Sequence, residues 1–536
     1  MSNRRLYYFL FPFFWALAFI AYYRAHGAQF VYDHNMWAEA YERLGWAGIR
    51  TQFGEKSLHY IFQYTYFLLY KVFGWNGWYW TTFQTAWHAV NAVLFFAMIR
   101  KWCGWYGISR PSQIAFIGAL FFLLSPYHTE VVIWGAGLEY MMITSFILVA
   151  LICLSEYFEN GEPRYFVLTY VFYLVGLLTW ELALVFPAMA FILFFLSPFD
   201  KVGFRRFMFT IFLPMSVLVP AYFLLTKWSS GSALTHYGAA AHMNVSPTLL
   251  IPNISRFLLK LFDVSLVYGK AHSYTFIQWL SKPMIVAVQI VIYIGILGFC
   301  LRALILRRHL FIVLMAGLGF VSLLPMLNLY FAYFTYIESD RYVYLCSGFF
   351  YGGLAMLFFQ LHRYLRCLFI AGFLFTQVFF LHRFVTTWRT SGRVVHGLVQ
   401  GFRWQDAPHI YVLATPDAVS GAWCLRSLPP YGIAIALKAQ RGIDISQKMD
   451  EVMQYEMNNR YDSCHAEKIG EGLYRYQFTQ YGNWFIKSGL GTGGWEDDKY
   501  KVEVDQWGMS FTVLIKKYVS GDVVIYQVRD HWEEVK

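Results

Sequence analysis

The chain has 536 residues, of which only 14% are charged while 21% are aromatic, and its formal net charge is +11. Ordinary globular proteins carry about 25% charged residues, so this composition excludes a secreted soluble enzyme and a disordered chain. Residues 1–383 hold 26 Lys and Arg with 14 Asp and Glu, whereas residues 384–536 hold 17 and 18. The sequence therefore predicts a membrane part followed by a soluble part. Because the basic residues stand mainly in loops between apolar runs, nucleic acid is not an expected partner.

Apolar runs dominate the first part. A helix that crosses a bilayer needs about 20 mostly apolar residues, and the pattern predicts a polytopic α-helical membrane protein with about 11 transmembrane helices. The first expected span has no small-residue cleavage site and is read as an anchor. The apolar segment 246–268 is interrupted by prolines and by Arg256 and Lys260, which predicts a partly embedded or interfacial helix in a long loop. The expected spans, each to within a few residues, are 6–23, 79–99, 111–127, 131–155, 165–180, 182–197, 207–226, 283–301, 310–328, 342–361 and 367–383.

Lys and Arg in the short loops predict the orientation of these spans. If the N-terminus is cytoplasmic, every loop on that side contains at least one Lys or Arg, whereas the short loops on the other side contain only Arg341. An odd number of spans then places residues 384–536 outside the cytoplasm. We expect an integral protein of a bacterial inner membrane with a periplasmic C-terminal domain.

The acidic residues show the opposite bias. Glu130, Glu181 and Glu338 stand in very short outer turns, where an aqueous loop has no need of a lone carboxylate, and ionisable residues at membrane depth indicate function. We expect these three and Asp33 to converge on the outer rim of the bundle. Glu139 would lie about 14 Å down the helix from Glu130 and is expected to be structural. The acids on the outer side are Asp33, Glu39, Glu42, Glu55, Glu130, Glu181, Asp263, Glu338 and Asp340.

The sequence predicts a connecting helix and linker over residues 384–408 and a small α+β domain over residues 409–536. A helix is expected over 445–459, and the Gly-rich run 489–495 is expected to be a flexible loop, because it lacks the context of a phosphate-binding loop. Cys424 and Cys464 either pair or remain free thiols. Alternation and apolar runs predict strands at 409–417, 433–437, 500–505, 510–517 and 522–528, the last two joined as a hairpin through residues 518–521.

Asp33 opens the polar run Asp33-His34-Asn35 in the first outer loop. A carboxylate that is partly desolvated at a membrane surface can accept a proton from a hydroxyl group, which makes Asp33 a candidate general base. The alternative is that Asp33 only caps the helix that follows it.

Arg341 is the strong cation of the last short outer loop. It could neutralise Glu338 or Asp340, or it could bind a phosphate, since a guanidinium group forms bidentate hydrogen bonds with phosphate oxygens. The polar triplet His128-Thr129-Glu130 could likewise be an ordinary turn that leaves the membrane.

Five segments, taken in chain order, resemble the membrane half of GT-C glycosyltransferases close to the tetratricopeptide-bearing O-mannosyltransferases. The similarity spans roughly residues 30–390. The chain departs from the family at Trp180, where the family has Lys, at Leu138, where it has Arg, and in the split of the Glu-Arg pair. An α+β domain also replaces the repeat-bearing tail. The segments are WHAVNAVLF at 87–95, HTEVV at 128–132, the EL-x4-P of TWELALVFP at 179–187, the P-x2-N at 325–328 and ESDRYVYLCSGF at 338–349.

The resemblance implies transfer of a sugar from a polyprenyl-phosphate donor to a hydroxyl group of a protein, glycan or lipid acceptor outside the cytoplasm. Asp33 matches the family's base. Arg341, with His128, would meet the donor phosphate. The number of acids leaves room for a divalent cation, although no single spacing demands one, and no other cofactor is implied. The side chains expected to hold the donor sugar or orient the cations are Glu130, Glu181, Glu338, His34 and Tyr344.

Two other functions fit the same composition. A transporter or a flippase for lipid-linked sugars would need a polar path through the membrane, and only Glu139 is expected to lie deep. A membrane scaffold that presents the tail would not need the clustered outer acids. We therefore expect a glycosyltransferase.

Overall fold

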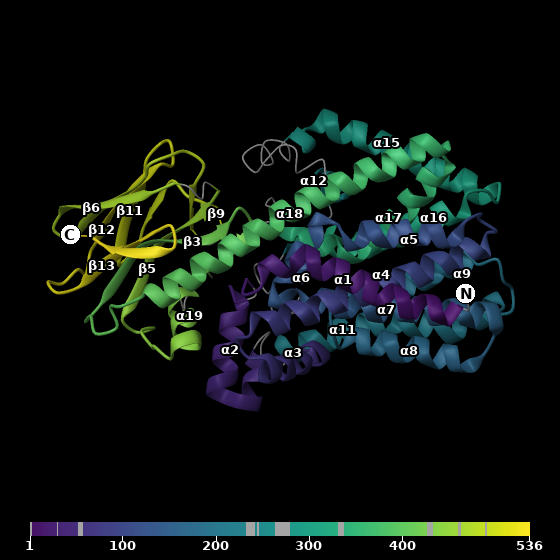
Figure 1. Cartoon of the computed structure of the whole chain (residues 1–536), viewed down its shortest axis with the longest axis horizontal. Helices are drawn as coiled ribbons and strands as arrows, with labels where there is room; N and C mark the ends of the chain where they lie inside the picture. The colour runs from purple at the N-terminus through teal and green to yellow at the C-terminus, as the bar shows by residue number, and fades with distance from the viewer. Residues whose placement is uncertain are drawn as a thin grey trace.

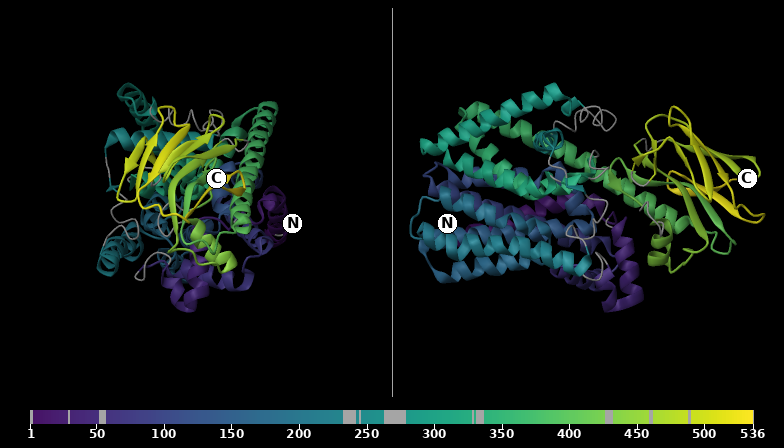
Figure 2. Two further views of the ribbon diagram at one scale, coloured as in Figure 1. Left: turned by 90° about the vertical axis from the view of Figure 1, so that its left-hand side faces the viewer. Right: turned by 180° about the vertical axis from the view of Figure 1, so that it is seen from behind.

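The computed structural model has two parts, a bundle of long helices and a β-rich domain, which one long helix joins (Figure 1). Seen from behind, the β-rich domain lies beyond one end of the bundle (Figure 2). The structure describes residues 3–28, 30–51, 57–231, 242–243, 246–262, 279–327, 329–330, 337–425, 432–458, 462–487 and 490–535.

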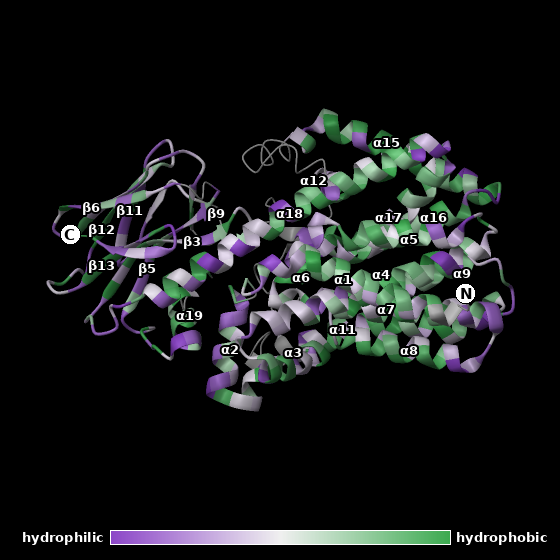
Figure 3. Ribbon diagram, in the orientation of Figure 1, coloured by the Kyte–Doolittle hydropathy of each residue, from purple (hydrophilic) through white to green (hydrophobic). Residues whose placement is uncertain are grey.

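Each expected span falls on a helix of the bundle. Eight stretches of the described chain are helical, long and apolar enough to cross a membrane. The other three expected spans fall on the helix pair Pro111–Leu123 and Pro126–Ile133, bent by 56°, and on the shorter apolar segments Pro163–Leu177 and Glu181–Leu196. Hydrophobic residues dominate these helices, as Figure 3 shows, so the fold is compatible with a polytopic membrane protein. The helices are α1 (Asn3–Tyr22), α4 (Gly77–Trp105), α5 (Pro111–Leu123), α7 (Leu138–Asn160), α8 (Pro163–Leu177), α9 (Phe186–Leu196), α11 (Leu213–Ser230), α15 (Pro283–Ile305), α16 (Leu310–Leu327), α17 (Tyr344–Gln360) and α18 (Arg363–Gly401).

Shorter helices gather at the end of the bundle that faces the β-rich domain. The helix expected within 246–268 is present as α12, and its Ser255 hydroxyl lies 2.6 Å from the Tyr293 hydroxyl of α15. The shorter elements are α2 (Asp33–Leu44), α3 (Tyr60–Phe73), α6 (Thr129–Ile133), α12 (Pro247–Leu261) and the 3-10 turns Glu181–Val185 and Ile337–Val343.

The chain breaks between α6 and α7, where the sequence predicted a nearly continuous helix from Glu130 to Glu139. Trp134 is extended and a 3-10 turn, Gly135–Gly137, follows it. A Cβ atom on Gly137 would lie 2.7 Å from the Cα of Val131, so only glycine allows this close return of the backbone. Glu139 therefore lies in the first turn of α7, and the depth expected for it along one straight helix was wrong.

The C-terminal domain contains two sheets. One is mixed, with the strand order β14-β13-β3-β5-β8-β9, in which β3 runs parallel to both β13 and β5; the other is antiparallel, with the order β10-β11-β12-β7-β6. A two-stranded pair, β1 (His242–Met243) with β2 (Leu329–Tyr330), belongs to the bundle. The domain's elements are β3 (Ile410–Val419), β4 (Ala422–Trp423), α19 (Gly432–Arg441), β5 (Met449–Met457), β6 (Cys464–Gly470), β7 (Leu473–Phe478), β8 (Trp484–Lys487), β9 (Leu490–Gly491), β10 (Gly494–Glu496), β11 (Tyr500–Val504), β12 (Ser510–Ile515), β13 (Val523–Val528) and β14 (His531–Glu534).

Two segments of this domain have a secondary structure other than the one expected. The run 433–437, expected as a strand, forms α19, and the run 445–459, expected as a helix, contains β5. The run 433–437 is short and apolar, and such a run does not distinguish a helix from a strand by periodicity. The run 445–459 is mostly polar, yet β5 within it is almost wholly buried because β3 and β8 flank it.

The remaining expectations for the domain had mixed outcomes. Strands β3, β11, β12 and β13 lie where they were expected, but β12 and β13 belong to different sheets, so the expected hairpin was wrong. The Gly-rich run contains β9 and β10, and its first residue lies outside the described residues. Cys424 and Cys464 are buried free thiols.

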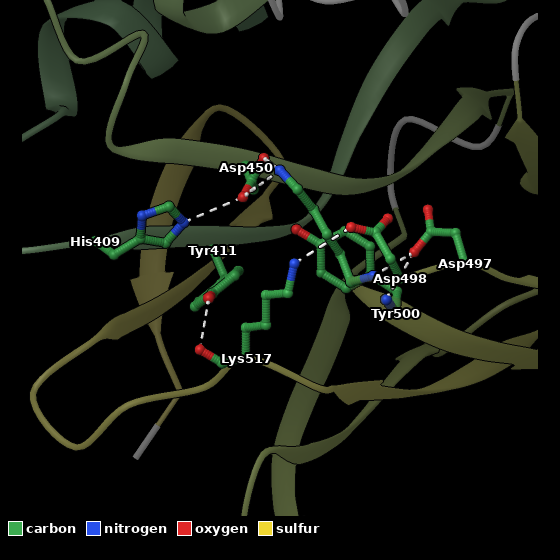
Figure 4. Close-up of polar contacts among 8 residues, drawn as sticks. His409, Tyr411, Asp450, Asp497, Asp498, Tyr500 and Lys517 are labelled. Atoms are coloured by element: carbon green, nitrogen blue, oxygen red, sulfur yellow. Dashed lines mark hydrogen bonds and ion pairs between the residues drawn. The ribbon is translucent and has the colours of Figure 1, made fainter.

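A polar cluster ties the two sheets together at one edge (Figure 4). Asp450 of β5 accepts from Lys499, at 2.9 Å between Nζ and Oδ1, and lies 3.2 Å from Nε2 of His409. Lys517, after β12, pairs with Asp498 at 3.2 Å. Partial burial, with the nearby acids Asp522 and Asp450, raises the pKa of the Tyr411 phenol to about 12. These groups satisfy one another, so we assign the cluster a structural role.

Candidate active site

Glu130 and Arg341 form an ion pair at the end of the bundle that faces the C-terminal domain. We call this end the covered end. Oε1 of Glu130, on α6, accepts from the guanidinium of Arg341, and the backbone amide of Arg341 donates to Oε2 at 2.9 Å. The guanidinium also lies over the rings of Trp134 and Tyr342, at 5.7 and 4.7 Å from their centres. The Glu130 side chain is only 4% exposed, so this carboxylate has exchanged water for these partners.

Two further cations reach the same place from α12. Lys260, with a side chain that is 2% exposed, donates to Oδ1 of Asp340. Arg256 is also buried and interacts electrostatically with Asp340 and Tyr342. The sequence named Arg341 as the strong cation of a short outer loop and left its partner open between Glu338, Asp340 and a phosphate. The structure pairs Arg341 with Glu130 and Lys260 with Asp340. We call Glu130, Arg341, Asp340 and Lys260 the ion-pair cluster.

Asp33 is the first residue of α2 and is half-buried. The residue before it, Tyr32, has a φ of 50° and ψ of −120°, a conformation that is unfavourable for a side chain of this size. Strained backbone of this kind tends to cluster at functional sites. The helix begins after Tyr32, and the N-cap position makes no side-chain hydrogen bond. Asp33 is thus part of the helix and not its N-cap residue.

Glu139 brings these groups into one electrostatic environment. The Glu139 side chain is buried, and the charges of Arg341, Glu181, Asp33 and Glu130 all act on it. Glu181 lies at the start of its 3-10 turn, where Oε1 is 3.0 Å from Nε2 of the buried His59. The predicted convergence of Asp33, Glu130 and Glu181 on one end of the bundle therefore agrees with the arrangement of the chain.

The C-terminal domain covers this end through β4. Nε1 of Trp423 donates to Oε1 of Glu130 at 3.1 Å, and the Trp423 ring lies 4.8 Å from that of Tyr32. The amide of Tyr32 donates to the carbonyl of Cys424 at 3.0 Å, so the strained residue is held by the soluble domain. Between the two parts remains a cavity of about 20 Å³, lined by Glu130, Asp340 and residues of both parts. The soluble domain thus supplies one wall of the site.

A buried carboxyl group lies directly behind this wall. Asp417, near the end of β3, is buried in the domain, and its backbone carbonyl accepts from the amide of Cys424 at 2.8 Å. Burial, reinforced by the charge of Glu456, raises the pKa of the Asp417 carboxyl to about 8. The Asp417 backbone thus helps to hold the segment that carries Trp423.

Three of the expected site residues lie in other surroundings. His128 is buried and bonds to the Ser347 hydroxyl at 2.8 Å, and the Tyr344 hydroxyl lies 2.7 Å from Nδ1 of His88. Neither has a described contact with the ion-pair cluster. His34 bonds to the Tyr66 hydroxyl at 2.5 Å and is enclosed by aromatic rings. His128, Tyr344 and His34 thus bond to groups outside the ion-pair cluster, and the donor contacts expected of them stay a prediction.

His128 and Tyr344 belong to a network of uncharged side chains between the helices. Asn91 donates to the Tyr344 hydroxyl at 3.3 Å and to the carbonyl of Met141 at 3.0 Å, and it accepts from the Ser145 hydroxyl at 2.6 Å. We call His88, Asn91, His128, Ser145, Tyr344 and Ser347 the neutral cluster. Two of its members, His88 and Asn91, come from the segment 87–95 of α4.

The side chain of Glu338 and all of Glu55 and Asp263 lie outside the described residues. Within the described ranges, no three His, Cys, Asp or Glu side chains are grouped so as to hold a metal ion.

Sequence reasoning missed four residues of the site, namely His59, Arg256, Lys260 and Trp423. Arg256 and Lys260 carried a usable signal, because two cations four residues apart in an apolar run fall on the same face of a helix. His59 and Trp423 stand in ordinary loop and strand contexts, and nothing in their neighbours indicates the site.

Comparisons with known proteins identify no relative of this chain. No protein-family model matches the sequence, and neither the curated proteins nor the solved structures that were searched contain a match.

Proposed function

We propose that the chain is a membrane glycosyltransferase that moves a sugar from a polyprenyl-phosphate donor to an acceptor hydroxyl group at the covered end of the bundle. The observation that carries the proposal is the gathering of Asp33, Glu130, Glu139 and Glu181 with Arg341 at one end of an apolar bundle. Burying charges is expensive unless they are paired, and apolar helix bundles rarely keep so many without a function.

In this proposal Asp33 is the general base. Its carboxylate accepts the proton of the acceptor hydroxyl group, and the acceptor oxygen attacks the anomeric carbon of the donor. The bond between that carbon and the phosphate oxygen breaks, and the lipid phosphate leaves with the bonding electrons. Direct displacement of this kind inverts the configuration at the anomeric carbon.

The cations would stabilise the phosphate as it leaves. Arg341 presents N–H donors in a planar fork that matches the oxygens of a phosphate, and it is held in place by Glu130 and Tyr342. Lys260 and Arg256 lie beside Asp340 and could turn to an incoming phosphate without moving far. Glu181, fixed by His59, and Glu139 would accept hydrogen bonds from the sugar hydroxyls.

The arrangement offers less support to a transporter or a flippase. Such a protein needs polar groups along a path through the bundle, and Glu139 lies at the same end as the other acids. The neutral cluster lies among the helices, but its groups bond to one another and to backbone carbonyls. A lipid-linked sugar that accumulates across a membrane without any transfer product would favour the flippase.

We also propose that the covered end faces the periplasm of a bacterium, on the strength of the loop charges. A reporter that is active only outside the cytoplasm, fused after Lys536, should be active. Activity of a cytoplasm-only reporter at that position would reverse the orientation.

The decisive experiment compares Asp33→Asn with Glu42→Gln, which makes the same change on an exposed residue of α2. Both purified proteins would be given a panel of polyprenyl-phosphate sugars and membrane extract as acceptor source. Loss of a general base costs about 10²–10⁴-fold in turnover, so Asp33→Asn should lose transfer with an unchanged melting temperature, while Glu42→Gln should match the wild type. Normal transfer by a folded Asp33→Asn protein would refute the assignment.

A further inference from the structure

A second cavity opens beside the first outer loop, apart from the proposed site. Its volume is about 580 Å³, and α18 forms one side while the residues between α1 and α2 and the start of α4 form the other. None of the groups assigned above to sugar transfer lines it. A cavity of this size falls in the range of ordinary ligand pockets, which is about 300–1,000 Å³.

The polar lining of this cavity is basic. Arg389, Arg393 and His396 project from one face of α18, spaced four and three residues apart, and His26 faces them from the first outer loop. All three α18 side chains are exposed. No acidic side chain lines the cavity, and within the described part of the chain neither guanidinium forms an ion pair.

Close backbone contacts shape the cavity. A Cβ atom on Gly392 would lie 2.7 Å from the Cα of Ala28, and one on Gly77 would lie 2.4 Å from the amide nitrogen of Gly27. The segment 26–28 is thus held between α18 and α4 at positions that admit only glycine. The His26 ring stacks on Trp78 with 4.1 Å between the ring centres. The cavity is therefore a built feature of the fold.

We infer that this cavity binds an organic phosphate. Guanidinium groups pair with phosphate oxygens through two parallel hydrogen bonds, and Arg389 and Arg393 lie one helical turn apart, about 6 Å along the axis. Phe30 and Trp75 add apolar faces for the organic part of the ester, which a bare ion would not need. The cavity lies beside the ends of the candidate spans α1 and α4, where a phosphate carried by a membrane lipid could reach it. The phosphate belongs either to a membrane lipid or to a soluble ester.

The test compares Arg389→Gln/Arg393→Gln, which removes two positive charges from the cavity, with Arg383→Gln, which removes one from an exposed position of α18 that does not line the cavity. One arm titrates detergent-purified protein with glycerol 3-phosphate by calorimetry. The other measures retained phosphatidylglycerol by native mass spectrometry after reconstitution in nanodiscs of that lipid. Melting temperatures check the folding of both variants, which should be unchanged because the three arginines are exposed.

The wild type and Arg383→Gln should bind alike, and the double variant should bind at least about tenfold more weakly, because each charge-assisted bond is worth tenfold or more. Loss confined to phosphatidylglycerol identifies a lipid headgroup, and loss in the glycerol 3-phosphate arm identifies a soluble ester. Equal binding by the double variant, or no binding of either probe by the wild type, would overturn the inference. Sugar transfer is measured separately, so failure of the proposed function leaves this result unaffected.

Discussion

The bundle contains two networks of buried polar side chains, and the two networks satisfy their polar groups in different ways. The neutral cluster, around Asn91 and Tyr344, uses uncharged groups that bond to one another and to backbone carbonyls between helices. The ion-pair cluster, around Glu130 and Arg341, contains charged side chains at the end of the bundle. The C-terminal domain covers it and contacts it through Trp423. A satisfied neutral network suffices to hold helices together, whereas buried charges cost stability. The ion-pair cluster is therefore the network whose cost in stability asks for a further explanation, and it is the one that the proposed function uses.

The largest effect should come from breaking the central ion pair. Arg341→Ala leaves the Glu130 carboxylate buried without its main partner, and such a loss costs about 3–5 kcal/mol. The double variant Glu130→Leu/Arg341→Met removes both charges and should recover most of that stability while binding of undecaprenyl phosphate stays lost. Melting temperature and lipid binding of the two variants, measured side by side, check this.

Arg341→Lys sharpens the same result, since Lys keeps the charge without the forked geometry of Arg. It should restore lipid binding only in part. Full binding by Glu130→Leu/Arg341→Met would show that the ion pair is structural, like the neutral cluster.

Next in size is the contribution of the soluble domain. Trp423→Phe keeps the ring against Tyr32 but removes the N–H that donates to Glu130, and hydrogen bonds to charged groups are worth about 1.5–3 kcal/mol. Lipid binding or transfer should fall by about 10–100-fold with little change in melting temperature. Trp507→Phe, an exposed position of the same domain, provides the control. Equal activity of the two variants would separate the domain from the site.

In the neutral cluster, Tyr344→Phe should affect stability and not function. It removes the hydroxyl group shared by His88 and Asn91, and leaving buried polar groups unpaired costs about 1–3 kcal/mol. We expect a lower melting temperature and normal lipid binding. Lost binding in a protein of unchanged stability would return Tyr344 to the donor site expected from the sequence.

The smallest effect concerns the contact between α19 and α2. Lys438 lies 2.7 Å from Asp444 and 3.4 Å from Glu39, and hydrogen bonds from Lys438 and Ser446 lower the pKa of the Asp444 carboxyl to about 2. A lowered carboxyl pKa stabilises the folded state above the unfolded value, and this contribution is lost as pH falls from about 4 to about 2. The pair is exposed, so the loss should stay below about 1 kcal/mol. Melting curves over this pH range should differ slightly between wild type and Asp444→Asn, and coincident curves would show that the pair contributes nothing.

The sequence predicted the parts of the fold that depend on local composition. Runs of about 20 apolar residues identify the helices wherever they pack, because the bilayer thickness is the same for all. Strands β3, β11, β12 and β13 were recognisable for a similar reason, since each has a local alternating or apolar pattern. Region 433–437 was misassigned because a short apolar run does not distinguish a buried helix from a buried strand. Region 445–459 was misassigned because the spacing of its apolar residues is helical, whereas pairing with β3 and β8 makes it a strand.

In the candidate site, too, some residues could be predicted from local sequence patterns and others could not. The gathering of acids on one side followed from the loop charges alone, and Asp33, Glu130, Glu181 and Arg341 were found by that route. Their partners could not be predicted in this way, because they are distant in the sequence. Lys260 and Asp340 are 80 residues apart, and Trp423 and Glu130 are 293 residues apart. No local pattern records contacts over such separations. The sequence by itself thus determined which segments are helical and apolar and which acids gather at one end of the bundle, whereas the tertiary structure decided which charges pair and which domain covers them.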